Sequence, residues 1–140
     1  MSTVEREQTL VVAVGSSGHL SSGTVEFAID YAKNLGLSVV VVHVGALMPT
    51  AAGAWYDATA AHALSVQAQT ALSRAERQVR DSAPPEVKVT GQLLFGGATG
   101  ALLDVSKHTQ MLVLEHDPES GVGPFRLGSV TAGVAARAHA

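Results

Sequence analysis

Two Gly- and Ser-rich segments of the sequence have the composition of loops that bind phosphate. The first reads GSSGHLSSG at residues 15–23, and the second reads EHDPESGVGPFRLGS at residues 115–129. Each follows an apolar run and leads into a segment with helical periodicity. Backbone N–H groups at the start of a helix point outward and carry partial positive charge, so both segments end where an anion such as phosphate is favoured.

Gly128 and Ser129 open the last predicted helix and are the best candidates for an anion site. The Ser129 hydroxyl can donate a hydrogen bond to a phosphate, Gly128 lets the phosphate approach the backbone, and Arg126 adds a cation nearby. The same two residues also serve without a ligand, with Gly128 as a turn residue and Ser129 as the helix N-cap. The residues alone leave both interpretations open.

Several better-defined motifs are absent. The segment 15–18 lacks the Lys-Ser/Thr ending of a P-loop, and its spacing does not match the Gly-x-Ser-x-Gly of a nucleophile elbow. A receiver domain needs an acidic pair after its first strand and an Asp after its third, where this chain has Gly15-Ser16 and Phe95-Gly96. A flavodoxin stays open as an alternative, because serines at 16, 17, 21 and 22 follow the first predicted strand.

Histidine and carboxylate residues suggest one further chemistry. His116 and Asp117 are adjacent after the fourth predicted strand and can form an acid/base pair or bind a metal; as an acid/base pair with Ser129 they would serve a nucleotide hydrolase. No second His/Glu pair has metal-ligand spacing and there are no cysteines, so no metal site is predicted. His43 lies within a predicted strand and is expected to be a core residue whose ring has a hydrogen-bond partner.

Alternating strands and helices must position these residues. Unbroken apolar runs such as TLVVAV at 9–14 are typical of strands buried on both faces of a parallel sheet. Ser22 or Thr24 is expected to cap the first helix, and Gly36 to end it. The third strand is half exposed at its start, as an edge strand would be. Strands are predicted at 9–14, 38–44, 87–95 and 110–114, and helices at 25–35, 61–80, 98–107 and 128–139.

This order predicts an α/β fold: a doubly wound parallel sheet in a three-layer, Rossmann-like α/β/α arrangement. The predicted strand order is 3-2-1-4, which makes the first and fourth strands neighbours where the winding reverses. Ligands of such sheets bind outside the carboxyl ends of the strands at this switch point. The segments 15–23 and 115–129 would therefore meet there.

Composition restricts the class of protein. The length of 140 residues predicts a single domain, in which residues 1–8 are expected to be flexible. The high share of hydrophobic residues, 46%, and the low share of charged residues, 15%, argue against a disordered chain. A net charge of −3 without a basic cluster argues against nucleic-acid binding. No apolar run is long enough to span a membrane, and the N-terminus lacks a signal peptide. With no cysteines, the expected location is the cytoplasm.

Four stretches of the chain resemble the universal stress protein (UspA-like) family. They are LVVAVGSSGHLSSGTVEFAIDYAKNLG at 10–36, SVVVVHV at 38–44, GGATGALLDVSKHTQMLVL at 96–114 and RLGSVTAGVAARA at 126–138. The resemblance implies the sheet described above, usually with a fifth strand and usually in a homodimer. The fifth strand is missing here, which would leave the fourth as an apolar edge, so either the sequence is truncated or a partner covers that edge.

The resemblance also implies a cleft for an adenine nucleotide, ATP or AMP, with Mg²⁺ only as its companion. Gly128 and Ser129 match the end of the family's Gly-x2-Gly-x9-Gly-Ser/Thr pattern. Glu115 stands where its first glycine belongs, and its carboxylate would repel a triphosphate. Pro118 replaces the second glycine, and Gly15 replaces an Asp. The predicted binding residues are Ala13, Gly15, Val44, Leu114, Glu115, Gly121, Gly123, Gly128, Ser129 and Val130.

Four of the remaining binding residues have an expected role. Val44 matches the apolar wall for the base, Ala13 lines the same cleft, and Gly121 with Gly123 could rebuild a phosphate nest. The expected function is that of a universal stress protein: a binding and signalling module of the stress response that is not an enzyme. The alternatives are a ligand-free dimeric scaffold and the hydrolase described above.

Overall fold

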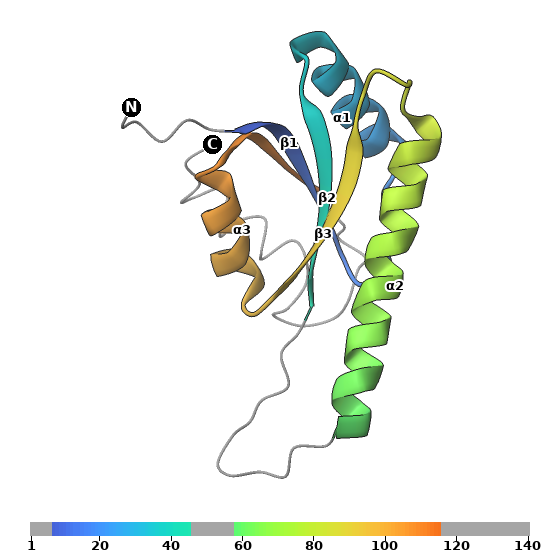
Figure 1. The fold of residues 1–140 in the computed structure, drawn as a ribbon, viewed down its shortest axis with the longest axis vertical. Coiled ribbons are helices and arrows are strands. Elements are labelled where there is room, and N and C mark those ends of the chain that lie inside the picture. Colours follow the sequence, from blue (N-terminus) through green and yellow to red (C-terminus); the bar gives the residue numbers. More distant parts are fainter. Residues whose placement is uncertain (1–6, 46–57, 116–140) are drawn as a thin grey trace.

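The computed structural model describes residues 7–45 and 58–115, and it contains the predicted alternation of strands and helices (Figure 1). Strand β1 begins two residues before the predicted start, so residues 7 and 8 belong to the sheet and not to a flexible terminus. The predicted helix at 128–139 lies outside the described residues. The elements are β1 (Glu7–Val14), α1 (Ser22–Leu35), β2 (Ser38–Gly45), α2 (Ala58–Ser82), β3 (Val89–Phe95), α3 (Ala98–Ser106) and β4 (Thr109–Leu114).

The four strands form one parallel sheet in the order β3-β2-β1-β4, as predicted. Helices α1 and α2 cover one face, and α3 covers the other (Figure 1). Strand β1 is therefore central, with β2 on one side and β4 on the other. This order confirms the doubly wound α/β fold and places the reversal of winding between β1 and β4.

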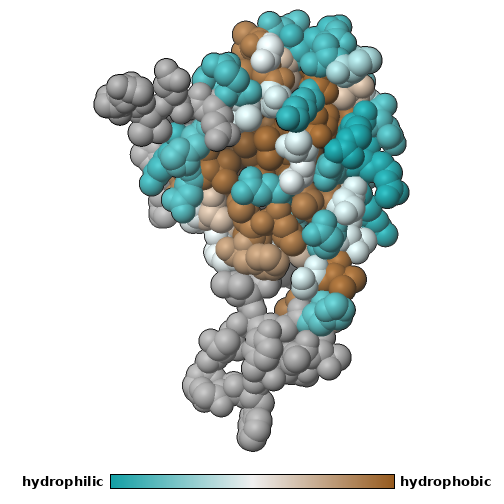
Figure 2. Space-filling model, viewed as in Figure 1, coloured by the Kyte–Doolittle hydropathy of each residue, from teal (hydrophilic) through white to brown (hydrophobic). Residues whose placement is uncertain are grey.

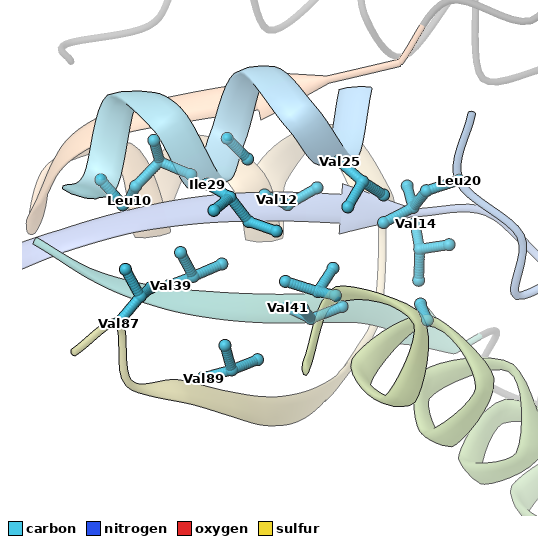
Figure 3. Close-up of a cluster of buried hydrophobic side chains, with 14 of the residues drawn as sticks. Leu10, Val12, Val14, Leu20, Val25, Ile29, Val39, Val41, Val87 and Val89 are labelled. Carbon is cyan, nitrogen blue, oxygen red and sulfur yellow. The ribbon is translucent and has the colours of Figure 1, made fainter. Parts of the chain in front are cut away.

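The core has two layers because successive side chains of a strand point to opposite faces. Leu10, Val12 and Val14 of β1 are buried with α1 and α2 in the larger cluster (Figure 3). Val11 and Ala13 face the other way and pack in a smaller cluster with α3. The unbroken apolar sequence of β1 thus fills both layers, as expected for a central parallel strand.

Helix α1 is capped by Ser21, not by Ser22 or Thr24. Ser21 has the extended backbone of an N-cap, and its hydroxyl accepts from the backbone N–H of Thr24 at 3.3 Å. Ser22 is already inside the helix, and Thr24 is the residue whose N–H needs the acceptor. At the other end Gly36 adopts φ +65°, and its N–H donates to Ala32, which confirms the predicted end.

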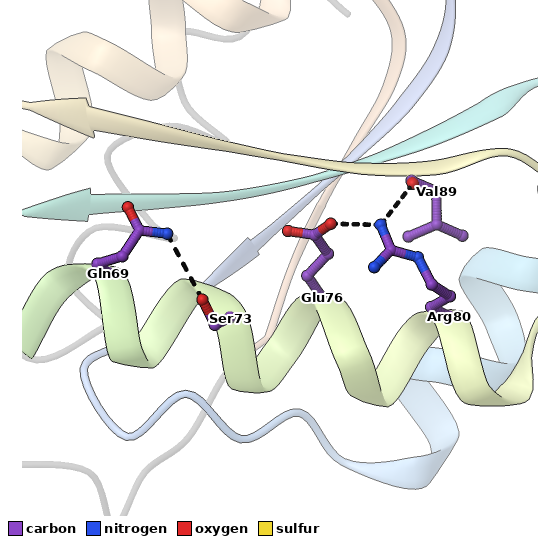
Figure 4. A network of polar contacts seen from close by, with 5 residues as sticks. All are labelled: Gln69, Ser73, Glu76, Arg80 and Val89. Atoms are coloured by element: carbon purple, nitrogen blue, oxygen red, sulfur yellow. Dashed lines mark hydrogen bonds and ion pairs between the residues drawn. The ribbon is translucent and has the colours of Figure 1, made fainter.

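Strand β3 is one of the two outer strands of the sheet in the described ranges, and Arg80 of α2 contacts a backbone carbonyl at its start (Figure 4). Arg80 pairs with Glu76 one turn earlier and donates to the carbonyl of Val89 at 3.0 Å. The strand begins at Val89, because the N–H of Val87 is held in a turn by the carbonyl of Pro84. A second contact on α2 joins Gln69 Nε2 to Ser73 Oγ at 3.5 Å.

The surface of the described part of the chain is polar on the outer side of α2, whereas hydrophobic residues reach the surface over the strands (Figure 2). Phe95, at the end of β3, is 48% exposed. In the ranges 7–45 and 58–115 there is no helix that combines the length and the hydropathy of a membrane span.

Candidate functional site

The carboxyl ends of β1 and β4 lie side by side, so the segments that follow them start at the same edge of the sheet. Ala13 is in register with Leu114, and the two strands are parallel. Strand β2 pairs with the opposite side of β1, also in parallel. The switch point predicted from the sequence is therefore confirmed, and residues 15–21 and Glu115 follow it; a ligand crevice is expected outside these strand ends.

Three of the predicted binding residues form an apolar wall on the α3 side of this crevice. Ala13 is 3% exposed and lies between Leu114 on β4 and Val42 on β2. Leu114 and Val44 are partly buried in the same cluster. The structure thus brings Ala13, Val44 and Leu114 together at one end of one face, although they come from three strands.

Glu115 points to the other side of the sheet. Met111 and Val113 pack against the cluster beneath α1, and Glu115 continues this alternation. Its Oε1 accepts a hydrogen bond of 2.8 Å from the backbone N–H of Ser21, the N-cap of α1. A carboxylate is stabilised there by the partial positive charge of the helix start. Glu115 therefore joins the end of β4 to the start of α1, a partnership that the sequence analysis did not predict.

The loop between β1 and α1 rests on α2. Gly18 adopts φ +72°, and a Cβ atom on it would lie 2.8 Å from the carbonyl oxygen of Ala71. Two hydrogen bonds tie the next part of the loop to Gln78: its Oε1 accepts from Leu20 N–H at 3.0 Å, and its Nε2 donates to the Leu20 carbonyl at 2.6 Å. Glycine at residue 18 is thus required by both its backbone conformation and the close approach of α2.

Gly15 begins this loop and leaves open space. No atom lies within 4 Å of the position that a Cβ atom would occupy there. Its carbonyl accepts from the N–H of Gly18 at 3.1 Å, which closes a turn. Gly15, which stands where the family pattern has an Asp, is therefore a turn residue directly after β1.

His43 is a core residue with a partner, as predicted. It is 7% exposed, and its Nδ1 lies 2.9 Å from the carbonyl oxygen of Val14, with which it is in register. A carbonyl only accepts, so Nδ1 carries the proton. The ring therefore ties the carboxyl end of β2 to that of β1, next to the crevice.

The remaining predicted residues fall in the part of the chain that the structure does not describe. They are Gly121, Gly123, Gly128, Ser129 and Val130, together with His116 and Asp117. Within the described ranges, no three His, Asp or Glu side chains are grouped as a metal site would require. A cavity of about 290 Å³ lies at the start of β3 beside Arg80 and Pro84, at the strand end opposite to the crevice.

The sequence analysis missed Ser21, Leu20 and Gln78, which shape the loop. Ser21 could have been found as the hydroxyl three residues before Thr24, the spacing of a cap. Gln78 offers no comparable signal, because a single Gln in an amphipathic helix is ordinary. Its role depends on a loop 58 residues away in sequence.

The sequence matches the profile of the Universal stress protein family over residues 7–140, which is most of the chain. The chain belongs to the universal stress protein family. Among curated proteins, no sequence is significantly similar to it.

Solved structures of universal stress proteins share the fold. One from Archaeoglobus fulgidus has 22% identity and a TM-score of 0.65, with 94% of this chain and 92% of that chain covered. A universal stress protein in complex with cAMP has 21% identity and a TM-score of 0.62, with coverages of 96% and 93%. The Archaeoglobus fulgidus protein in complex with dAMP has 22% identity and a TM-score of 0.61, with coverages of 98% and 94%.

Proposed function

We propose that this universal stress protein binds an adenine nucleotide at the carboxyl ends of β1 and β4 and acts as a binding and signalling module without turnover. The observation that carries the proposal is the apolar wall of Ala13, Val44 and Leu114 at the switch point. Two solved structures with the same fold contain an adenine nucleotide, cAMP in one and dAMP in the other. Ligands of doubly wound sheets bind at this position.

The chemistry of the crevice suits the parts of such a ligand. An apolar wall at the end of a sheet offers the planar base a surface that excludes water, which is the main source of affinity for an aromatic group. Gly15 leaves room beside this wall, because no atom would contact a Cβ there. The phosphate is proposed to bind Gly128 and Ser129 at the start of the last predicted helix. Mg²⁺ would enter only with the nucleotide.

A pair of matched substitutions tests the position of the ligand. Val40 and Val44 are both partly buried in the α3-side cluster, but Val40 lies near the start of β2 and Val44 at its carboxyl end. Val44→Glu places a carboxylate in the proposed site, and Val40→Glu places one elsewhere on the same strand and face. We expect isothermal titration with AMP and ATP to show binding by the wild type and Val40→Glu, and its loss in Val44→Glu.

Two results would contradict the proposal. One is the absence of saturable binding of adenosine, AMP and ATP to the wild type at millimolar concentration. The other is equal nucleotide affinity in the two Val→Glu variants. The absence of turnover is tested separately by incubation with ATP. ADP or AMP release that disappears in His116→Ala or Asp117→Ala would instead identify a hydrolase.

The ligand-free dimeric scaffold is the second candidate. Strand β4 is an outer strand of the sheet in the described part of the chain, and its apolar residues from Met111 to Leu114 are only partly buried. An uncovered apolar edge favours pairing with another chain. Light scattering that finds a dimer, combined with no nucleotide binding, would select this candidate.

A further inference from the structure

Strand β3 pairs with β2 on one side and with no other strand of the described residues on its second side. Successive residues of a strand direct their backbone groups to opposite sides. The Lys88 carbonyl accepts from the N–H of Val39 at 2.8 Å, so Lys88 and every second residue after it face β2. The backbone N–H and C=O groups of Gly91, Leu93 and Phe95 therefore face away from the sheet and can pair with an added strand.

Arg80 closes the amino end of this free edge. Its Nη2 donates to the carbonyl of Val89, the first outward carbonyl of the strand, at 3.0 Å. Before this point the chain turns, because the N–H of Val87 is bound by the carbonyl of Pro84. Within residues 7–45 and 58–115, no hydrogen bond joins the outward backbone groups of β3 after Val89 to another element. An added strand can therefore pair along residues 91–95 and must end at Arg80.

The guanidinium group of Arg80 has further hydrogen-bond donors beside this edge. Its Nη2 serves both Glu76 and the Val89 carbonyl, while Nε and Nη1 have no partner among the residues that the structure describes (Figure 4). The side chain of Arg80 is 56% exposed and that of Glu76 only 24%, so a ligand meets the positive charge first. A cavity of about 290 Å³ adjoins Arg80, and its other lining residues are Ala83, Pro84, Pro85, Val87 and Val89. A cation beside apolar walls fits a carboxylate that is attached to an apolar side chain.

We propose that the free edge of β3 binds the carboxyl-terminal end of an extended peptide from a partner protein. The peptide backbone pairs with Gly91, Leu93 and Phe95, its terminal carboxylate lies at Arg80, and its last side chain enters the cavity. Charge determines the direction, because an antiparallel peptide brings its carboxylate to Arg80, whereas a parallel peptide brings its positively charged amino end there. Since pairing ends at Arg80, the carboxylate in line with the peptide backbone is the terminal one.

This surface would give the proposed binding and signalling module a protein partner. It does not depend on nucleotide binding, because β2 and β1 separate β3 from β4 in the sheet. The inference can therefore fail while the proposed nucleotide site stands, and the reverse is also true.

The first test uses an array of synthetic peptides with randomised sequences in their last residues, about five, which is the length that spans residues 91–95. The array is prepared once with free carboxyl ends and once with amidated ends. We expect the wild-type protein to bind peptides of the first set and not their amidated copies. Binding by neither set, or equal binding by both, overturns the proposal.

The second test titrates the tightest-binding peptide into the wild type and two variants. Arg80→Gln removes the proposed carboxylate partner, and Arg77→Gln removes the same charge from an exposed position on the same helix. We expect the affinity to fall about tenfold to a hundredfold in Arg80→Gln, as the loss of a charge-assisted hydrogen bond predicts. In Arg77→Gln it should change less than about twofold. Equal affinities in the two variants overturn the proposal.

Hydrogen exchange of the wild type locates the peptide without any variant. Bound peptide should slow the exchange of the amides of Gly91, Leu93 and Phe95, and leave those of Gln92 and Leu94, which face β2, unchanged. Protection that falls elsewhere, or equally on all five amides, overturns the added strand. Because this measurement and the peptide array use the wild type, the proposal stays testable even if Arg80→Gln does not fold.

Discussion

Replacing Gly18 with Ala tests the contact that holds the loop between β1 and α1 against α2. A Cβ atom at this position would lie 2.8 Å from the carbonyl oxygen of Ala71 and 2.9 Å from its Cα. Both are backbone atoms of a long helix, so neither can rotate away as a side chain would. The loop or the helix must therefore shift, and the loop frames the proposed crevice.

Gly36→Ala is the matched control, because it separates the backbone strain from the collision. Gly36 has φ +65°, close to the +72° of Gly18, but nothing lies within 4 Å of its added Cβ. An Ala in this left-handed conformation costs about 1–2 kcal/mol, which is the whole expected effect at residue 36. Gly18→Ala adds the overpacking against α2 and is expected to cost about 2–5 kcal/mol in total.

The assay is urea unfolding followed by circular dichroism, with the free energy of unfolding taken from the midpoint and slope of each variant. We expect Gly18→Ala to be less stable than Gly36→Ala by about 1–3 kcal/mol. Equal losses in the two variants would refute the close approach of the loop to α2. A larger loss of stability in Gly36→Ala than in Gly18→Ala would also refute the argument that the two positions share the same backbone strain.

Three further substitutions test contacts around the crevice and the sheet edge. His43→Leu leaves a buried β1 carbonyl without its donor and should lower the free energy of unfolding by about 2 kcal/mol; unchanged stability would contradict the bond. Gln78→Leu removes both hydrogen-bond partners of the Leu20 backbone and should increase the hydrogen-exchange rate of the Leu20 amide. An exchange rate equal to that of the wild type would contradict this, because it would show that the contact does not protect the amide. Arg80→Ala uncovers an edge carbonyl of β3 and should give larger assemblies by light scattering than the wild type at equal concentration; identical sizes would contradict this.

The order of the elements and the class of the sheet follow from the sequence alone. Apolar runs such as that of β1 and three- and four-residue apolar steps in the helices are local patterns, and a parallel sheet is the arrangement that buries them. Gly36 ends α1 as predicted, because a left-handed residue after a helix is a local requirement that glycine meets. Handedness rules restrict the topology to a few strand orders, and the order that makes β1 and β4 neighbours is one choice among these, which the structure confirms.

The tertiary structure decided which residues shape the crevice. The partners of Glu115 and Gln78 lie 94 and 58 positions away, and no periodicity links them. Ser21 became the cap, among three hydroxyls in four residues, because only its backbone is extended where the chain leaves the loop. The sequence placed Glu115 in the cleft, but the alternation of β4 directs its carboxylate to α1. Local patterns specify elements, whereas side-chain partners depend on register and loop path, which are fixed only when the elements pack.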